Sequence, residues 1–363
     1  MEAVRGRFFD LRSAHGAKAP SGLEGASFGL GLVGAKASAR FIALRDHIKV
    51  PCILDSAASA RSIATSATPL DYSELTGMLG PEIYHRDALS LGAAASLSAS
   101  CYIEAHDTAA LEAVAESSSR IDSGGVIASV ALDVKWLRND AVDELIEVLR
   151  GISRPVALTL GGQFNPTDAH TTSIPNLRRI YRECGHVGLW RVDVLVGFDA
   201  MVHGALFAGI GNSGTLRHLV PPDEKPRFGG GGGRPAVYIP KLMQYFSLDT
   251  LTDRWTQVGG LICDCPVCEG RAPTWMAELS EGMRAAAADH NLWCWLRLWE
   301  ELDEGSSAER ASRLADRIVA AVEAHTEESE RVGALGAFKP SPTLATMAKL
   351  AALTPEAART PAP

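Results

Sequence analysis

The sequence predicts an α/β protein: a TIM-type (β/α)8 barrel with an inserted structural zinc-binding subdomain. Over residues 40–250, apolar runs rich in valine and isoleucine alternate with helical stretches. Most of these runs are continuously apolar, which is typical of parallel strands covered on both faces. Polar residues follow several runs directly, and the carboxyl ends of the strands are where barrel enzymes keep their chemistry.

Six segments have the length and composition of a buried strand. They are residues 50–54, 126–132, 156–160, 192–196, 207–210 and 236–239. Helices are expected between them at 108–117, 140–150 and 174–184. Because a helix between two strands returns the chain to the same edge of the sheet, this alternation favours a parallel sheet or a closed barrel.

The chain divides into four expected parts. Residues 1–258 form the barrel core, 259–300 the zinc-binding subdomain with its histidine-bearing helix, 301–330 a C-terminal helix and 331–363 a flexible tail. The tail is rich in alanine, proline and threonine, which indicates loose packing. A mobile loop is expected at 221–234, where two prolines precede five consecutive glycines.

Composition and charge exclude some classes of protein. The chain has 363 residues and a formal net charge of −8, so it lacks the wholly basic surface of a nucleic-acid coat protein. One basic groove stays compatible with that balance. No apolar stretch follows the basic N-terminal residues, and no apolar run reaches the roughly 18 residues of a membrane span. We therefore expect a cytoplasmic protein that does not enter a membrane.

Three of the seven cysteines crowd into six positions. Cys263, Cys265 and Cys268 form a C-x-C-x-x-C run, and His290 follows the third cysteine by 22 residues. In a large chain without a secretory signal, this spacing indicates a metal site and not a disulfide framework. Three thiolates and one imidazole make a closed, tetrahedral Zn2+ site of the structural kind. Cys294, one helical turn after His290, is a rival ligand.

This segment resembles the zinc-binding segment of the tRNA-guanine transglycosylase family, most closely that of its archaeal branch. The resemblance implies a zinc subdomain inserted late in a TIM barrel, with a helix after the histidine packed against it. Enzymes of that family break an N-glycosidic bond and install another base. The motif covers a short part of the chain, so the remaining residues are compared motif by motif.

The family presents an Asp-Ser-Gly-Gly after an early barrel strand, and its Asp acts as the general acid/base. Two segments compete for this position. Asp55 and Ser56 end an apolar run, where a barrel enzyme keeps its acid/base groups, but two alanines follow in place of the glycines. Residues 122–125 match the four letters, but they precede a strand and are expected on the opposite face of the barrel. A turn using the two glycines is the alternative there. We predict that Asp55 is the catalytic residue.

Two further strand ends resemble the part of the family's site that contacts the base. Asp133 follows the run 126–132 and resembles the base-reading Asp, so we take it as the second catalytic carboxylate. Gly161 and Gly162 resemble the family's Gly-Gly contact, and Gln163 beside them offers both a donor and an acceptor. The alternatives stay open: Asp133 pairing with Lys135, and the glycines forming a plain strand-to-helix turn.

The family's covalent nucleophile, an Asp on the last strand, has no counterpart. Segments 204–211 and 235–241 are the two candidates for that strand, and neither contains an Asp. Hydrolytic excision of a base needs no covalent aspartate: one carboxylate activates water while the base leaves. The target base would have to be flipped out of its stack to enter such a pocket.

Cations cluster around the glycine-rich stretch of this otherwise acidic chain. If the stretch contacts phosphates it would position a nucleic acid without reading its sequence, and the alternative is a solvated loop. The candidate nucleic-acid-binding residues are Arg217, His218, Arg227, Arg234 and Lys241.

The expected function is cleavage of an N-glycosidic bond in a nucleic acid, in first place hydrolytic excision of a base from DNA. DNA stands first by analogy with DNA-acting relatives of the family. Exchange of guanine for a 7-deazaguanine in tRNA or DNA is the first alternative. A catalytically inactive subunit that binds nucleic acid is the second. A homodimer is left open.

Overall fold

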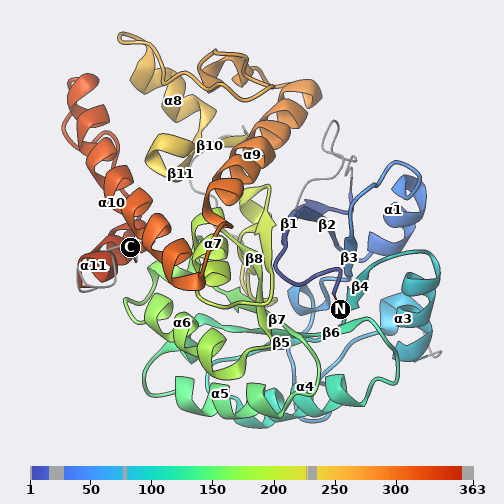
Figure 1. Ribbon diagram of the computed structural model, residues 1–363. Coiled ribbons are helices and arrows are strands. Elements are labelled where there is room, and N and C mark those ends of the chain that lie inside the picture. Colours follow the sequence, from blue (N-terminus) through green and yellow to red (C-terminus); the bar gives the residue numbers. More distant parts are fainter. Residues whose placement is uncertain (1, 16–27, 77–79, 226, 228–234, 354–363) are drawn as a thin grey trace. The chain divides into compact units, whose positions relative to one another are not determined.

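The computed structural model describes residues 2–15, 28–76, 80–225, 227 and 235–353. The chain forms two compact units, Met1–Arg227 and Phe228–Pro363. The first unit is a closed ring of eight parallel strands surrounded by helices, so the predicted (β/α)8 barrel is confirmed (Figure 1).

The ring closes because its first strand pairs with both its second and its last. In ring order the strands are β1 (Phe8–Ser13), β2 (Phe28–Val33), β3 (Cys52–Asp55), β4 (Ala95–Leu97), β6 (Val126–Asp133), β7 (Val156–Gly161), β8 (Val187–Val192) and β9 (Ala208–Gly211). The short strand β5 (Tyr102–Ile103) pairs with the carboxyl end of β6, as β4 does with its beginning. The fourth position in the ring is therefore one strand interrupted between residues 97 and 102.

The described helices of this unit follow the strands in the order that a barrel requires. They are α1 (Ala37–Leu44), α2 (Ser73–Thr76), α3 (Pro81–Ser90), α4 (Thr108–Arg120), α5 (Val142–Gly151), α6 (Ser173–Cys184) and α7 (Val194–Val202). The three helices predicted from sequence correspond to α4, α5 and α6. Asp107 caps α4 by accepting the Ala110 N–H at 3.0 Å, as short polar residues commonly do at a helix start.

The lumen of the barrel is filled by large aromatic side chains set against glycines. Phe9 and Trp190 are fully buried, and their ring centroids lie 6.1 Å apart. A Cβ on Gly29 would lie 2.2 Å from the Phe9 ring, and one on Gly209 would lie 2.3 Å from Trp190. Glycine on one strand therefore leaves the volume that an aromatic ring on another strand occupies, and the barrel is a packed core and not a pore.

Two predicted strands are corrected. Residues 192–196 are not a strand: β8 ends at Val192, and Asp193 caps α7 by accepting the Leu195 N–H at 3.0 Å. The apolar run continued across this boundary because both the strand and the helix are buried. Residues 236–239 do form a strand, β10 (Ala236–Ile239), but it pairs antiparallel with β11 (Gln244–Ser247) in the second unit.

The second unit begins before the boundary expected at residue 258. Besides β10 and β11 it contains α8 (Leu248–Trp255), α9 (Glu281–Leu302), α10 (Ser307–Arg331) and α11 (Pro342–Leu353). The hairpin and α8 share one apolar core with the cysteine segment, which explains why the division lies near residue 227. All eight barrel strands precede it, so this unit follows the barrel and is not inserted between its strands.

The segment expected to be a flexible tail contains packed structure. Phe338 is buried in the apolar core of the second unit, and α11 buries Leu344 and Met347 completely. Residues 354–363 lie outside the described part of the chain. In the described part, no helix is long and apolar enough to cross a bilayer.

Candidate functional site

Asp55 lies at the carboxyl end of β3, at the mouth of the barrel. Its side chain is buried, and both carboxylate oxygens accept hydrogen bonds, from the Ala57 N–H at 2.7 Å and from the Trp190 indole N–H at 2.9 Å. Strands β3 and β8 are four positions apart in the ring of eight, so the bond to Trp190 spans the lumen. Two N–H donors fix the orientation of this carboxylate.

Strained backbone gathers at the same end of the barrel. Among its described residues, four that are not glycine have a positive φ: Ala57 (54°), His106 (62°), Phe164 (57°) and Arg191 (56°). They follow or end β3, β5, β7 and β8, all at the carboxyl ends. Such conformations cost roughly 1–3 kcal/mol each and concentrate at functional sites. The mouth of the barrel is therefore the candidate active site.

Asp133 ends β6 on the same rim. Its carboxylate accepts the Lys135 N–H at 2.8 Å and lies 3.4 Å from the Tyr102 hydroxyl, which donates to it. Burial and the negative charge of Asp133 raise the pKa of that hydroxyl, so Tyr102 stays a proton donor. The contact to Lys135 expected from sequence is made by its backbone N–H.

Gly161, predicted to contact a base, lies beside Asp133 in the register of β6 and β7. A Cβ at Gly161 would lie 2.3 Å from the Tyr102 ring, so that ring occupies the space above the glycine. Gly162 donates its N–H to the Leu219 carbonyl at 2.8 Å. Glycine at residue 161 leaves space for the Tyr102 ring, and the backbone of Gly162 contacts Leu219.

Gln163 uses its amide within the protein. Its Nε2 donates to the Glu224 carboxylate at 2.6 Å and to the Lys225 carbonyl at 3.2 Å, and its Oε1 accepts the Arg227 N–H at 3.0 Å. The next residue, Phe164, leaves half of its side chain exposed. An exposed aromatic ring at the rim gives no sequence signal, because it sits alone in a loop.

Residues 212–219, here called the crossing segment, run over the mouth of the barrel. The segment leaves β9 and joins the end of β7, where the Leu219 N–H donates to the Leu160 carbonyl at 3.2 Å. Leu216 belongs to the apolar core of the lumen, and Leu219 packs on Tyr102 and Ala131. Two predicted nucleic-acid-binding residues, Arg217 and His218, therefore belong to the barrel rim.

Arg217 and His218 have different surroundings. The Arg217 side chain donates to the carbonyl of Gly211 at 3.0 Å. Burial, together with the positive charges of Arg191 and Arg217, lowers the pKa of His218 to about 4. His218 is therefore a neutral ring near neutral pH.

The remaining cations of the predicted basic stretch are dispersed. Arg227 is exposed in the first unit, and Lys241 lies in the second unit, where it pairs with Glu327 at 3.0 Å. Arg234 lies outside the described residues, as do the five glycines. Among the described members of the set in the first unit, Arg217 and His218 lie in the crossing segment, and the Arg227 N–H donates to Gln163 after β7.

Asp193 is a rim carboxylate that sequence reasoning missed, because residues 192–196 were expected to be one strand. It follows β8 directly and is half-buried. Burial raises the pKa of Asp193, and the positive charge of Arg217 opposes that rise. The sequence signal that could have revealed it is an Asp directly after an apolar run, because Asp at that position commonly caps a helix.

The rival motif at residues 122–125 lies at the opposite end of the barrel. It precedes β6, and the guanidinium of Arg154 donates to the carbonyls of Ile121 and Ser123. Gly125 has a φ of 67°, as a turn requires, whereas Gly124 does not adopt positive φ. Asp122 therefore faces away from the mouth that holds Asp55.

The last barrel strand carries no carboxylate at its described end. It is β9, and it ends at Gly211, where a Cβ would lie 2.3 Å from the backbone of Leu216. The crossing segment thus leaves no room for a side chain at this position. The sequence has no Asp at the end of this strand, and the structure has no space for one at Gly211.

The second unit brings Cys263, Cys265, Cys268 and His290 together, as their spacing predicts. Their ligand atoms all lie within 4.8 Å of one another. From the Nδ1 of His290 the sulfurs are 3.8, 3.4 and 3.4 Å away, in chain order. The ligands of one tetrahedral ion with bonds of about 2.0–2.3 Å lie roughly 3.5–3.8 Å apart, so the donor set fits a metal ion.

Hydrogen bonds orient the histidine for this role. Its Nε2–H donates to the Tyr238 carbonyl at 2.9 Å, which leaves the Nδ1 lone pair facing the sulfurs. Asn291 fixes the same strand: its Oδ1 accepts the Tyr238 N–H at 2.7 Å, and its Nδ2 donates to the Ala236 carbonyl at 3.1 Å. The helix α9 and the hairpin are thereby locked on either side of the cluster.

Cys294 lies close to the cluster but outside the compact set of four. Its sulfur is 3.8 Å from both ring nitrogens of His290, so it packs against the edge of the ring. A cavity of about 340 Å³ adjoins Cys263, Cys265 and Cys294. Of the three tryptophans on this helix, Trp295 and Trp299 are fully buried, as packing residues are.

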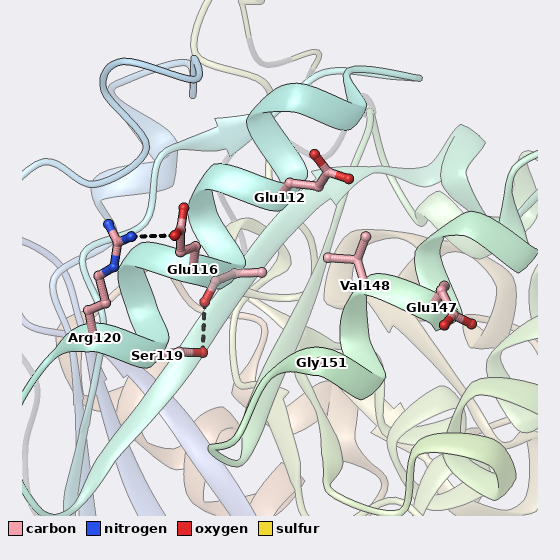
Figure 2. Close-up of a pocket in the computed structure, with 8 residues that line it drawn as sticks. Glu112, Glu116, Ser119, Arg120, Glu147, Val148 and Gly151 are labelled. Atoms are coloured by element: carbon pink, nitrogen blue, oxygen red, sulfur yellow. Dashed lines mark hydrogen bonds and ion pairs between the residues drawn. The ribbon is translucent and has the colours of Figure 1, made fainter.

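A groove on the outer helical layer is a poor candidate for chemistry. It measures about 540 Å³ and lies between α4 and α5 (Figure 2). Glu116 pairs with Arg120 across its wall, and Ser119 donates to the Ala115 carbonyl at 2.8 Å. These pairs leave no arrangement of nucleophile and base, and the groove is remote from the strand ends that carry Asp55 and Asp133.

Comparison with known proteins adds only distant likenesses. No protein-family model and no curated protein matches the chain. The 4-hydroxy-tetrahydrodipicolinate synthase from the methanotroph Methylacidiphilum fumariolicum SolV is similar at 11% sequence identity and a TM-score of 0.30, covering 59% of this chain and 70% of that one. PipY of Synechococcus elongatus, solved without PLP, is similar at 12% identity and a TM-score of 0.28, covering 58% and 92%. Neither likeness bears on function.

Proposed function

We propose that this protein is an enzyme that cleaves an N-glycosidic bond in a nucleic acid, in first place by hydrolytic excision of a base from DNA. The observation that supports this most is Asp55: a buried carboxylate at a strained barrel mouth, oriented by Trp190 from the opposite strand. An oriented carboxylate suits general-base activation of a water molecule.

In the proposed reaction, the oxygen of water forms a bond to the anomeric carbon and gives up a proton to Asp55. The electron pair of the breaking C–N bond moves to the base, which takes a proton from solvent. Asp133 and the donor hydroxyl of Tyr102 contact the polar edge of the base. No last-strand carboxylate is needed for this route, in keeping with Gly211.

We infer that Zn2+ is the ion of the cysteine cluster and that its role is structural. Three thiolates and an imidazole are the ligand set of closed zinc sites, and four protein ligands leave no position for substrate. The ion would hold the Cys263–Cys268 turn against α9 and the hairpin, as the Nε2–H bond of His290 to Tyr238 suggests. It would supply no step of the reaction.

The test is base release from DNA and tRNA, measured as abasic sites, with Asp55→Asn and Asp122→Asn as matched variants. Asp55→Asn keeps the shape of the side chain but cannot accept a proton, so we expect a loss of about 10²- to 10⁴-fold in rate. Asp122→Asn should act like wild type, since Asp122 lies at the other end of the barrel.

The other functions appear as distinct results of the same experiment. Incorporation of a free labelled base without abasic sites would indicate base exchange. Binding of nucleic acid with neither product would indicate an inactive partner subunit. Equal activity of the Asp55→Asn protein would remove Asp55 from the proposal.

A further inference from the structure

Arg191 is the buried cation of the barrel mouth, and its surroundings do not satisfy it. It is the last but one residue of β8, with 8% of its surface exposed and a φ of 56°. Between Leu189 and Val192 the pairing of β8 with β9 shifts register, which marks a bulge. A bulge re-aims a side chain that regular alternation would turn toward the outer helices.

The guanidinium makes one hydrogen bond and leaves two donors without an acceptor. Its Nη2 donates to the Thr215 carbonyl on the crossing segment at 3.1 Å. Its Nε and Nη1 are buried and find no partner among the described residues. Leaving a buried, charged donor without an acceptor costs free energy. The positive φ of Arg191 adds backbone strain. A bound ligand that accepts hydrogen bonds would compensate for these costs.

One carboxylate and one histidine lie near Arg191. Asp55 interacts electrostatically with the guanidinium. His218 lies near Arg191 and carries no charge near neutral pH, so its ring can offer an N–H. The two unpaired donors lie in the guanidinium plane but point to different sides of it, since Nε–H lies on the side of Nη2 and Nη1 on the opposite side.

We propose that Arg191 binds a phosphate group of the substrate at the mouth of the barrel. The unpaired Nε–H and Nη1–H groups can each donate a charge-assisted hydrogen bond to a phosphate oxygen. The position agrees with general barrel architecture: β8 and β9 are the seventh and eighth strands, and the loops after these strands frequently bind phosphates.

The phosphate could be the internucleotide diester of a nucleic acid or the monoester of a free nucleotide, since both present the same pair of oxygens. This proposal does not depend on glycosidic cleavage: a barrel that acts on another phosphorylated substrate would use Arg191 in the same way.

The experiment is calorimetric titration of the full-length chain with inorganic phosphate, a deoxynucleoside 5′-monophosphate and a short single-stranded DNA. We expect the Arg191→Gln protein to bind at least one of them about 10- to 100-fold more weakly than wild type, as loss of charge-assisted hydrogen bonds implies. Arg120→Gln is the control, because Arg120 is an exposed arginine on α4. Weakening for DNA alone would identify the diester, and weakening for the nucleotide would identify the monoester.

A second readout separates binding from a structural role. Removing a buried guanidinium with two unpaired donors should leave the thermal midpoint of the free protein unchanged or higher, whereas phosphate should raise the midpoint of wild type more than that of the variant. If Arg191→Gln does not fold, Arg191→Lys keeps the charge without the guanidinium donors and should weaken binding by the same test. Absence of binding of all three ligands by wild type, or unchanged affinity for all of them in a folded Arg191 variant, would overturn the proposal.

Discussion

At the scale of single residues, the lumen depends on which strand carries glycine. Gly31 and Gly209 both face the ring of Trp190, and a Cβ at either position would lie within 3 Å of it. The ring in turn brings its N–H to Asp55. The same side chain, Trp190, therefore fills the lumen and orients Asp55, the proposed general base.

We expect Gly209→Ala to lower the free energy of unfolding by about 1–3 kcal/mol, because an added methyl overlaps a ring that has no empty volume to enter. Gly124→Ala is the control: no heavy atom lies within 4 Å of its Cβ position and its φ is not positive, so it should be near neutral. Urea denaturation of the two variants measures the difference. Equal stability of both would mean that Trp190 can move aside.

The candidate residues that the sequence indicated are those marked by a pattern among residues close along the chain. It missed residues whose importance depends on contacts with residues far away in the sequence. The four metal ligands follow from their spacing, and Asp55 follows from the end of an apolar run. The importance of Trp190 and Arg191 could not be predicted, because one acts across the lumen and the other owes its direction to a bulge.

At the scale of elements, a buried histidine joins α3 to the sheet. The Nε2 of His85 lies 2.7 Å from the Tyr72 hydroxyl, and its Nδ1 lies 2.7 Å from the Ser96 hydroxyl on β4. The Tyr72 oxygen also accepts the Ala99 N–H. Burial lowers the pKa of His85 to about 4, with a further contribution from the positive charge of Arg154.

This pKa predicts acid sensitivity. Unfolding returns His85 to a pKa near 6.5, so below that value the unfolded chain binds a proton that the folded chain refuses. The contribution to stability is complete above pH 6.5 and is lost as the pH falls toward 4, by roughly 3 kcal/mol. We expect His85→Gln to remove this part of the pH dependence, measured by denaturation at pH 7 and pH 4.5. Parallel curves for both proteins would contradict the assignment.

Of the strands in the ring, the sequence predicted β3, β6, β7 and β9, and it did not predict the interruption of the fourth ring position. The fourth ring position is split after residue 98: the Ser98 N–H still donates to the Ile127 carbonyl at 2.9 Å, but its hydroxyl accepts the Ser129 N–H at 2.9 Å. A side chain thereby replaces a backbone acceptor, which no hydrophobic pattern reveals. Strands β1 and β2 were missed for a related reason: polar residues or glycines interrupt their apolar runs.

At the scale of the whole molecule, the two units differ in what stabilises them. The barrel has a dense aromatic lumen, whereas the second unit builds its apolar core around the cysteine segment. Loss of the metal should therefore act on the second unit first.

We expect Cys265→Ala to lose the bound metal and to lower the thermal transition of the second unit, because a structural site contributes directly to folding. Cys184→Ala, in the barrel unit, should keep a full complement of zinc. Metal analysis and scanning calorimetry, with and without a chelator, make the comparison. Zinc retained in full by Cys265→Ala, or a chelator that moves only the barrel transition, would contradict the assignment.

The rim of the barrel has a negatively charged side and a positively charged side. Around Tyr102 lie the negative charges of Asp133, Asp223 and Glu224, while Arg191 and Arg217 lie toward β8 and β9. A polyanion would therefore be drawn to one side of the mouth, which local composition along the chain does not reveal.

The hydrogen bond between Trp190 and Asp55 also makes the fluorescence of Trp190 a measure of changes at the barrel mouth. Indole emission shifts with the electric field along the ring, and here a carboxylate sits at the ring's N–H, 2.9 Å away. A proton arriving on Asp55, or an anion settling beside Arg191, would change that field. The difference in fluorescence between wild type and Trp190→Phe would then record events at the mouth in real time, without a label.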